Sequence, residues 1–107
     1  MKRGEVWWVT FSASVGGEIQ KERPAVIVSN DVANRLMNRV QVVPLTSNID
    51  KLYPSEAYVV VNRVKHKAMA DQITTISKVR VTNQMGTLSQ ADIQAVERVV
   101  KVQLGLP

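Results

Sequence analysis

Short runs of branched apolar residues, separated by polar turns, make up most of this 107-residue chain. Runs of this length favour β-strands, because a helix needs a longer amphipathic stretch to cover a core. A short helical turn is expected over Val32–Leu36, after Asn30-Asp31. The expected strands are Glu5–Phe11, Ala25–Ser29, Arg39–Leu45, Glu56–Val61, Ala68–Ile76 and Val79–Thr82. This pattern predicts a mainly β fold with helices, built as a strongly bent sheet or small barrel.

One long helix is expected at the end of the chain. Ser89 is a suitable N-cap, and Asp92 three residues later resembles a capping box. Apolar residues then recur on one face as far as Leu104, and Gly105 follows as a stop. The sequence therefore predicts a terminal amphipathic helix that lies across the sheet.

Composition limits the class of protein. With 45% hydrophobic residues the chain can bury one small core, so a single domain over 1–107 is expected, and oligomerisation would help it. No apolar run of eighteen residues and no apolar signal region is present, so no membrane partner is expected. The absence of cysteine excludes disulfides and thiolate catalysis and fits a reducing cytoplasm, and one histidine cannot build a structural zinc site.

The positive charge points to a polyanionic partner. The formal net charge is +5 and the pI is near 9.9, which suits nucleic acid, although solubility alone also explains such a charge. A basic run, Asn62–Lys67, is interpreted as a connector that can hold an RNA backbone. His66 lies alone among lysines there, and a surface position is favoured for it over a catalytic one.

A polar loop opened by paired glycines, Gly16–Pro24, carries the first candidate site. Arg23 presents a planar set of donors that suits phosphate oxygens. Glu18 is a candidate general base, or a group that orients one. The alternative for both is a surface ion pair within the loop.

Two further polar clusters are candidates. Thr46-Ser47-Asn48 ends an expected strand with donors that could bind a phosphate or a developing oxyanion, although such residues also make ordinary turns. Asp71-Gln72 interrupts an apolar run, which favours a groove-facing role and a structural role equally. No cofactor fingerprint or paired metal-ligand motif is present, so an activity without cofactor or metal is the simpler enzymatic hypothesis.

Five motifs in the same order resemble the MazF/PemK family, the toxins of bacterial type II toxin–antitoxin systems. The resemblance covers nearly the whole chain. Its motifs are Arg3-Gly4-Glu5-Val6-Trp7-Trp8-Val9, Gly16-Gly17-Glu18 with Arg23-Pro24-Ala25-Val26, Val43-Pro44-Leu45-Thr46-Ser47, Ala70-Asp71-Gln72-Ile73, and Gly86-Thr87-Leu88-Ser89 before the terminal helix.

The resemblance implies both a fold and an activity. The fold would be an SH3-like small β-barrel of the PemK/CcdB type with a C-terminal α-helix. The protein would act as a homodimer with an RNA groove near the interface. The activity would be metal-independent, sequence-specific cleavage of single-stranded RNA, mostly mRNA. Attack by the ribose 2′-hydroxyl would leave a cyclic phosphate and a 5′-hydroxyl.

The resemblance also implies roles for single residues. Arg23 would stabilise the pentavalent phosphate and assist the leaving oxygen, Thr46 would bind the scissile phosphate, and Glu18 matches an acid that some members use. RNA contacts are expected from Gly17, Lys21, Asn30, Ser47 and Gln72. Gly17 stands where many members carry serine, and the loop Ser12–Lys21 varies in the family, so the cleavage sequence is not predicted.

A cognate antitoxin with an acidic, partly disordered C-terminal tail is the implied partner, and the cytoplasm is the implied location. One alternative is a non-catalytic inhibitor of DNA gyrase on the same fold. Val102–Pro107 lacks the terminal tryptophan-containing ending expected of that class. Another alternative is an RNA-binding module that binds without cutting.

Overall fold

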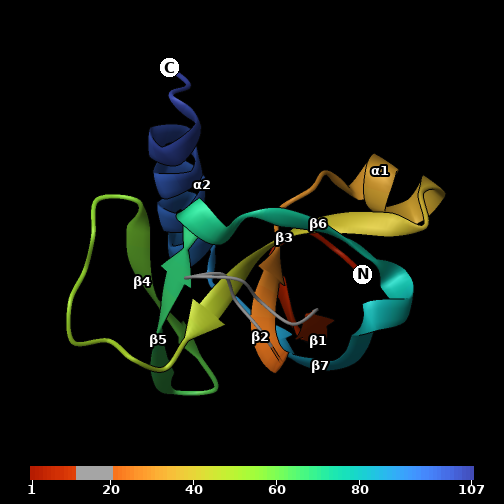
Figure 1. Cartoon of the computed structure of the whole chain (residues 1–107), viewed down its shortest axis with the longest axis horizontal. Helices are drawn as coiled ribbons and strands as arrows, with labels where there is room; N and C mark the ends of the chain where they lie inside the picture. The colour runs from red at the N-terminus through yellow and green to blue at the C-terminus, as the bar shows by residue number, and fades with distance from the viewer. Residues whose placement is uncertain (12–20) are drawn as a thin grey trace.

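The computed structural model describes residues 1–11 and 21–107, with Lys21 described by its backbone alone. Gly17 and Glu18 lie outside the described residues. Two α-helices, α1 (Asp31–Leu36) and α2 (Gln90–Leu104), and two 3-10 turns, η1 (Ala70–Gln72) and η2 (Lys78–Arg80), accompany the strands (Figure 1). The seven strands of this part of the chain are β1 (Glu5–Phe11), β2 (Lys21–Ile27), β3 (Arg39–Thr46), β4 (Glu56–Val61), β5 (Val64–Met69), β6 (Thr74–Ser77) and β7 (Val81–Thr87).

All described strand pairs are antiparallel, in the order β4-β5-β3-β2-β1-β7, with β6 paired to β3. One edge of β3 changes partner along its length. It pairs with β6 over Arg39–Val42 and with β5 at Leu45 and Thr46. Pro44 lies between these two ladders, which suits a residue that has no N–H to donate. The strand expected over Ala68–Ile76 is therefore wrong, since η1 bridges this change of partner and separates β5 from β6.

The two outer strands of the path, β4 and β7, approach each other without forming a ladder. Asn62, in the turn after β4, donates from its Nδ2 to the carbonyl of Met85 on β7 at 2.8 Å. A Cβ placed on Gly86 would lie 3.0 Å from Cγ1 of Val61, so glycine permits this approach. The predicted fold, mainly β with a barrel-like sheet and a C-terminal helix, is confirmed, although the sheet does not close.

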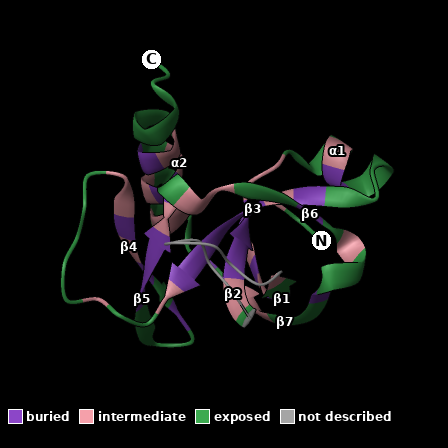
Figure 2. Cartoon of the chain, in the orientation of Figure 1, coloured by how far each residue is buried: buried purple, intermediate pink, exposed green. Residues whose placement is uncertain are grey.

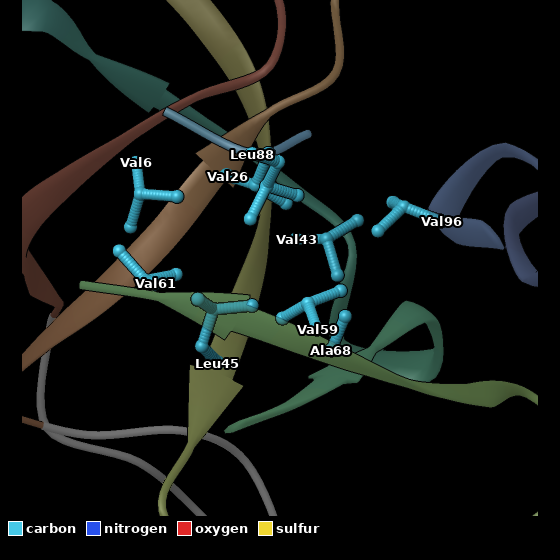
Figure 3. Packing of buried hydrophobic residues seen from close by; sticks show 9 residues of the cluster. All are labelled: Val6, Val26, Val43, Leu45, Val59, Val61, Ala68, Leu88 and Val96. Atoms are coloured by element: carbon cyan, nitrogen blue, oxygen red, sulfur yellow. The ribbon is translucent and has the colours of Figure 1, made fainter. Parts of the chain in front are cut away.

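Two apolar clusters lie on opposite faces of the central strands, because successive residues of a strand point to opposite sides. The first lies between the sheet and α2, which contributes Val96 (Figure 3). The second contains Val9, Ala25 and Ile27, with Trp7 packed against it. Figure 2 shows the buried residues concentrated on β2, β3 and β5.

Helix α2 begins as predicted. The Oγ of Ser89 accepts a hydrogen bond from the Asp92 N–H at 3.1 Å, and Gly105 ends the helix in the left-handed region at a φ of 68°. The capping box is wrong in one respect. The Asp92 carboxylate accepts from the N–H of Val60 on β4 at 2.9 Å, and so ties the helix to the sheet.

Three expected boundaries differ from the structure. The second strand begins at Lys21 rather than Ala25, so Arg23 lies within β2. The basic run Asn62–Lys67 is not a connector, since a turn at Asn62 and Arg63 leads directly into β5. The last strand, expected over Val79–Thr82, is β7 and runs from Val81 to Thr87, where pairing with β1 overrides the turn preference of residues 83–86. No helix among the described residues is long and apolar enough to cross a membrane.

Candidate functional site

Polar and charged side chains form a row across one face of the sheet. Val9 on β1 is opposite Arg23 on β2. The β2–β3 ladder ends at the pair of Ala25 and Pro44, and Arg23 and Thr46 are the residues two positions beyond that pair, one on each strand. Thr46 is in turn opposite Lys67 on β5. Opposite residues of an antiparallel pair point to the same face, so Arg23, Thr46 and Lys67 share one side of the sheet.

Arg23 is a half-buried residue with one unsatisfied donor. Its Nε is buried and has no hydrogen-bond partner within the part of the chain that is described. A buried N–H without a partner costs free energy, and most buried polar groups in folded proteins avoid that state. An anion bound on this face would remove that cost, and a phosphate oxygen matches the geometry of a guanidinium.

Thr46 ends β3 and begins the hydroxyl-rich corner. Its Oγ1 accepts a hydrogen bond from the backbone N–H of Asn48 at 3.2 Å, which holds the chain in a tight turn. Among the described residues this hydroxyl donates no hydrogen bond, so its proton can be offered to a ligand oxygen. Ser47 is exposed directly after it. The corner is therefore both an ordinary turn and a donor site beside Arg23.

Sequence reasoning did not single out Lys67, which is the buried cation of the row. Its side chain is only 8% exposed, and its Nζ lies 3.0 Å from the Glu56 carboxylate, itself 9% exposed. Beyond Lys67 the row reaches Tyr58 on β4, whose ring lies under the ammonium of Lys65 at 4.0 Å. No residue pattern identifies Lys67, because its burial depends on the ion pair with Glu56 on the neighbouring strand.

Two expected RNA contacts lie elsewhere. Asn30 is the N-cap of α1, and its Oδ1 accepts from the N–H of Ala33 at 2.9 Å. It lies seven residues beyond Arg23, on the order of 20 Å along an extended chain. Gln72 belongs to η1, beside the middle of β3 rather than its end. The row therefore includes Arg23 and Thr46, with Ser47 directly after Thr46, and leaves Asn30 apart from them.

The first expected loop is only partly described. Gly17 and Glu18 lie outside the described residues, so their positions relative to Arg23 stay predictions. The backbone of Lys21 opens β2 opposite Phe11, two residues before Arg23.

His66 is buried, contrary to the surface position that the sequence favours. It is 6% exposed, and neither ring nitrogen has a hydrogen-bond partner among the described residues. Burial lowers the pKa of His66 below its ordinary value, because charging the ring would cost hydration. Its position between Lys65 and Lys67 on β5 points it to the opposite face from the row. The expected surface position is wrong because residues 64–69 form a strand, and the side chain of His66 lies on its buried face.

The chain resembles known proteins over its whole length. Residues 2–104 match the family model described as PemK-like, MazF-like toxin of type II toxin–antitoxin system. Among individual proteins, the chain is 37% identical to endoribonuclease MazF9 of Mycobacterium tuberculosis, over 99% of this chain and 98% of that protein. It is 28% identical to endoribonuclease EndoA of Bacillus subtilis, over 99% of this chain and 96% of that one.

Solved structures share the fold. A MazF from Deinococcus radiodurans superposes with a TM-score of 0.87 at 23% identity, over 99% of this chain and 97% of that one. A mycobacterial endoribonuclease, solved in complex with its cognate antitoxin, gives a TM-score of 0.84 at 24% identity, over 100% of this chain and 97% of the other. At these identities the superpositions establish the fold, and the family assignment depends on the sequence matches.

Proposed function

This chain belongs to the family of PemK-like, MazF-like toxins of type II toxin–antitoxin systems, and from that premise we propose that it is an endoribonuclease that cuts single-stranded RNA. The observation that carries the proposal is the Arg23 Nε, which is buried and has no hydrogen-bond partner among the described residues, on a strand whose neighbour carries Thr46 two residues beyond the last pair of the ladder. A phosphodiester presents the negatively charged oxygens that such a pair binds.

The proposed reaction needs no redox step or cofactor. The 2′-oxygen of the ribose attacks the adjacent phosphorus, and the P–O2′ bond forms as the P–O5′ bond breaks. The 2′-hydroxyl loses its proton to a base, for which Glu18 is the proposed group, and the 5′-oxygen gains one. The products are a 2′,3′-cyclic phosphate and a 5′-hydroxyl. Charge builds on the nonbridging oxygens in the transition state, where Arg23 and the Thr46 hydroxyl can stabilise it.

The RNA partner, the homodimer and the cytoplasmic location belong to the same proposal. The net charge of +5 favours both RNA and an acidic antitoxin tail, because each is a polyanion. The similar mycobacterial endoribonuclease, solved with its cognate antitoxin, supports an antitoxin as partner. Ser47 and Gln72 remain proposed RNA contacts, as do Gly17, Lys21 and Asn30.

The test is cleavage of a long defined RNA by the purified protein in EDTA, followed by mapping of the new ends. We expect discrete cuts with 5′-hydroxyl ends. Arg23→Ala should lower the rate of cleavage about 10²- to 10³-fold, the usual cost of losing one group that stabilises transition-state charge. Arg98→Ala is the matched control, since it removes the same charge from an exposed position on α2.

Full cleavage by folded Arg23→Ala protein would remove Arg23 from the site. Binding of RNA by the wild-type dimer without any cleavage would instead support an RNA-binding module. Circular dichroism of each variant checks that its fold is intact.

A further inference from the structure

We propose that Lys67 is a positioning residue of the proposed ribonuclease site: it ties the segment Ser47–Ser55 to the sheet and thereby fixes the Thr46 corner. This inference rests on the proposed function. Lys67 binds protein groups rather than RNA, so substitution of Lys67 should have different effects from substitution of Arg23.

The first support is the set of partners that Lys67 has. Its Nζ forms an ion pair with Glu56 and donates a hydrogen bond to the carbonyl of Lys51. It also lies 5.7 Å from the centre of the Tyr53 ring. Lys51 and Tyr53 belong to the segment Ser47–Ser55, and Glu56 is the first residue of β4, directly after it. One buried ammonium therefore holds this segment at several points.

The second support is the register. Lys67 is directly opposite Thr46, so the tie is made on the strand next to the candidate site. Tyr58, opposite Lys67 on the other side, adds a hydrogen bond from its hydroxyl to the carbonyl of Ile49 at 2.9 Å. The segment is thus held by β4 and β5 together, close to the point where it leaves β3.

The third support links this tie to the Thr46 hydroxyl. The Asn48 N–H that occupies the Thr46 Oγ1 belongs to the segment that Lys67 holds. With that acceptor site occupied, the hydroxyl proton is directed elsewhere, and its direction depends on the path of the segment. Misplacement of a catalytic group by about 1 Å can cost about 100-fold in rate, so a loosened segment would slow the reaction.

Lys67 does not resemble a phosphate ligand. Its charge is balanced by Glu56, and its side chain is almost fully buried. Lysines that bind RNA backbones release counterions and contribute to the salt dependence of binding. Lys67 should make no such contribution, and this separates a positioning role from direct contact.

The test uses the double variant Glu56→Gln/Lys67→Met, which removes the tie without leaving a buried charge unpaired. Lys101→Met is the matched control, since Lys101 is an exposed lysine on α2, away from the row and from the segment. We expect the double variant to lose at least about 10-fold in kcat with KM within about twofold, the pattern of an interaction needed only in the transition state. The control should keep both values within about twofold.

A second measurement uses an RNA that carries 2′-deoxyribose at the mapped cut site and therefore cannot be cut. Its binding constant K is measured at several salt concentrations. Arg23→Ala should lower the slope of log K against log salt by about 0.7, the value for one contact to a single strand. The double variant should leave the slope unchanged. A slope reduced by the double variant would show direct phosphate contact and overturn the positioning role, as would an unchanged kcat.

Amide hydrogen exchange provides a readout that does not need activity. Exchange at Asn48 and Asp50, whose N–H groups donate to Thr46 and Asn48, should become faster in the double variant and not in Lys101→Met, while exchange in β1 and β2 stays slow. Unchanged exchange at Asn48 and Asp50 would overturn the tie itself. If the wild-type protein cut no RNA, the proposed function would fail together with the catalytic part of this inference, and the exchange result would still decide whether the tie exists.

Discussion

Arg23 and His66 both carry buried nitrogen atoms without partners among the described residues, yet they call for opposite explanations. Arg23 is always charged, so its buried Nε favours an anion. His66 can lose its charge, and burial among apolar neighbours such as Val59 stabilises the neutral ring. The same structural observation therefore points to a ligand in one case and to a pH-dependent stability in the other.

We expect acid to destabilise the protein through His66. Its folded pKa is lowered, so the unfolded chain binds a proton more readily, and stability is lost as the pH falls below the unfolded value near 6.5. Above that pH the ring is neutral in both states and contributes nothing. One group changes the free energy of unfolding by at most about 1.4 kcal/mol per pH unit.

Urea unfolding of wild type and His66→Leu at pH 7.5 and pH 5.5 measures this contribution. The variant should lose less stability over that interval than wild type does. If both proteins lost the same free energy of unfolding between the two pH values, the folded protein would bind the charged ring of His66 as readily as the neutral ring.

At the scale of elements, α2 was predictable because its signals are local. Ser89, the apolar stripe and Gly105 define the helix without reference to the sheet. Strand β7 was not predictable in the same way, because Asn83–Gly86 has turn composition and becomes extended only by pairing with β1. Strand β5 was missed because its lysines suggest an exposed connector, whereas Lys67 is buried through its ion pair with Glu56.

The N-cap of α2 should contribute measurably to stability. Ser89→Ala removes the acceptor for the Asp92 N–H and should lower the free energy of unfolding by about 1 kcal/mol. Ser89→Asp keeps an acceptor at this position and should stay within a few tenths of a kcal/mol of wild type. Chemical denaturation of the three proteins gives the values, and equal losses in both variants would contradict the cap.

At the scale of the whole molecule, the family and the barrel-like fold could be inferred from the order of five motifs, and both are confirmed. Arg23 and Thr46 could be named as candidates from residue chemistry. That they lie on adjacent strands at the same end of the ladder could not be predicted, because it depends on the register of β2 against β3. Lys67 could not be named at all, since its role depends on the path of a segment that residue patterns do not define.

The contact between β4 and β7 is where the barrel-like sheet comes nearest to closing. Asn62→Gly keeps a residue that tolerates the positive φ of 50° at this turn but loses the hydrogen bond to Met85. We expect the free energy of unfolding to fall by about 1 kcal/mol, measured by urea unfolding.

Arg63→Gly is the control for that variant. Arg63 has a φ of 67°, so glycine relieves strain there while leaving the Asn62 hydrogen bond in place. It should be neutral or slightly stabilising. A loss of stability in Arg63→Gly equal to that in Asn62→Gly would assign the effect to the turn rather than to the link between the strands.

The order of the row along the chain has a consequence for how the protein is made. Leu88 and Val96 complete the core beneath α2, and they come late in the chain. The residues of the row all precede them: Val9, Arg23, Thr46, Tyr58 and Lys67. During synthesis the ribosome therefore releases every member of the row before it releases the helix that covers the sheet. A nascent chain therefore holds these side chains before the fold that aligns them exists, and we expect the row to be assembled only after the last helix has packed.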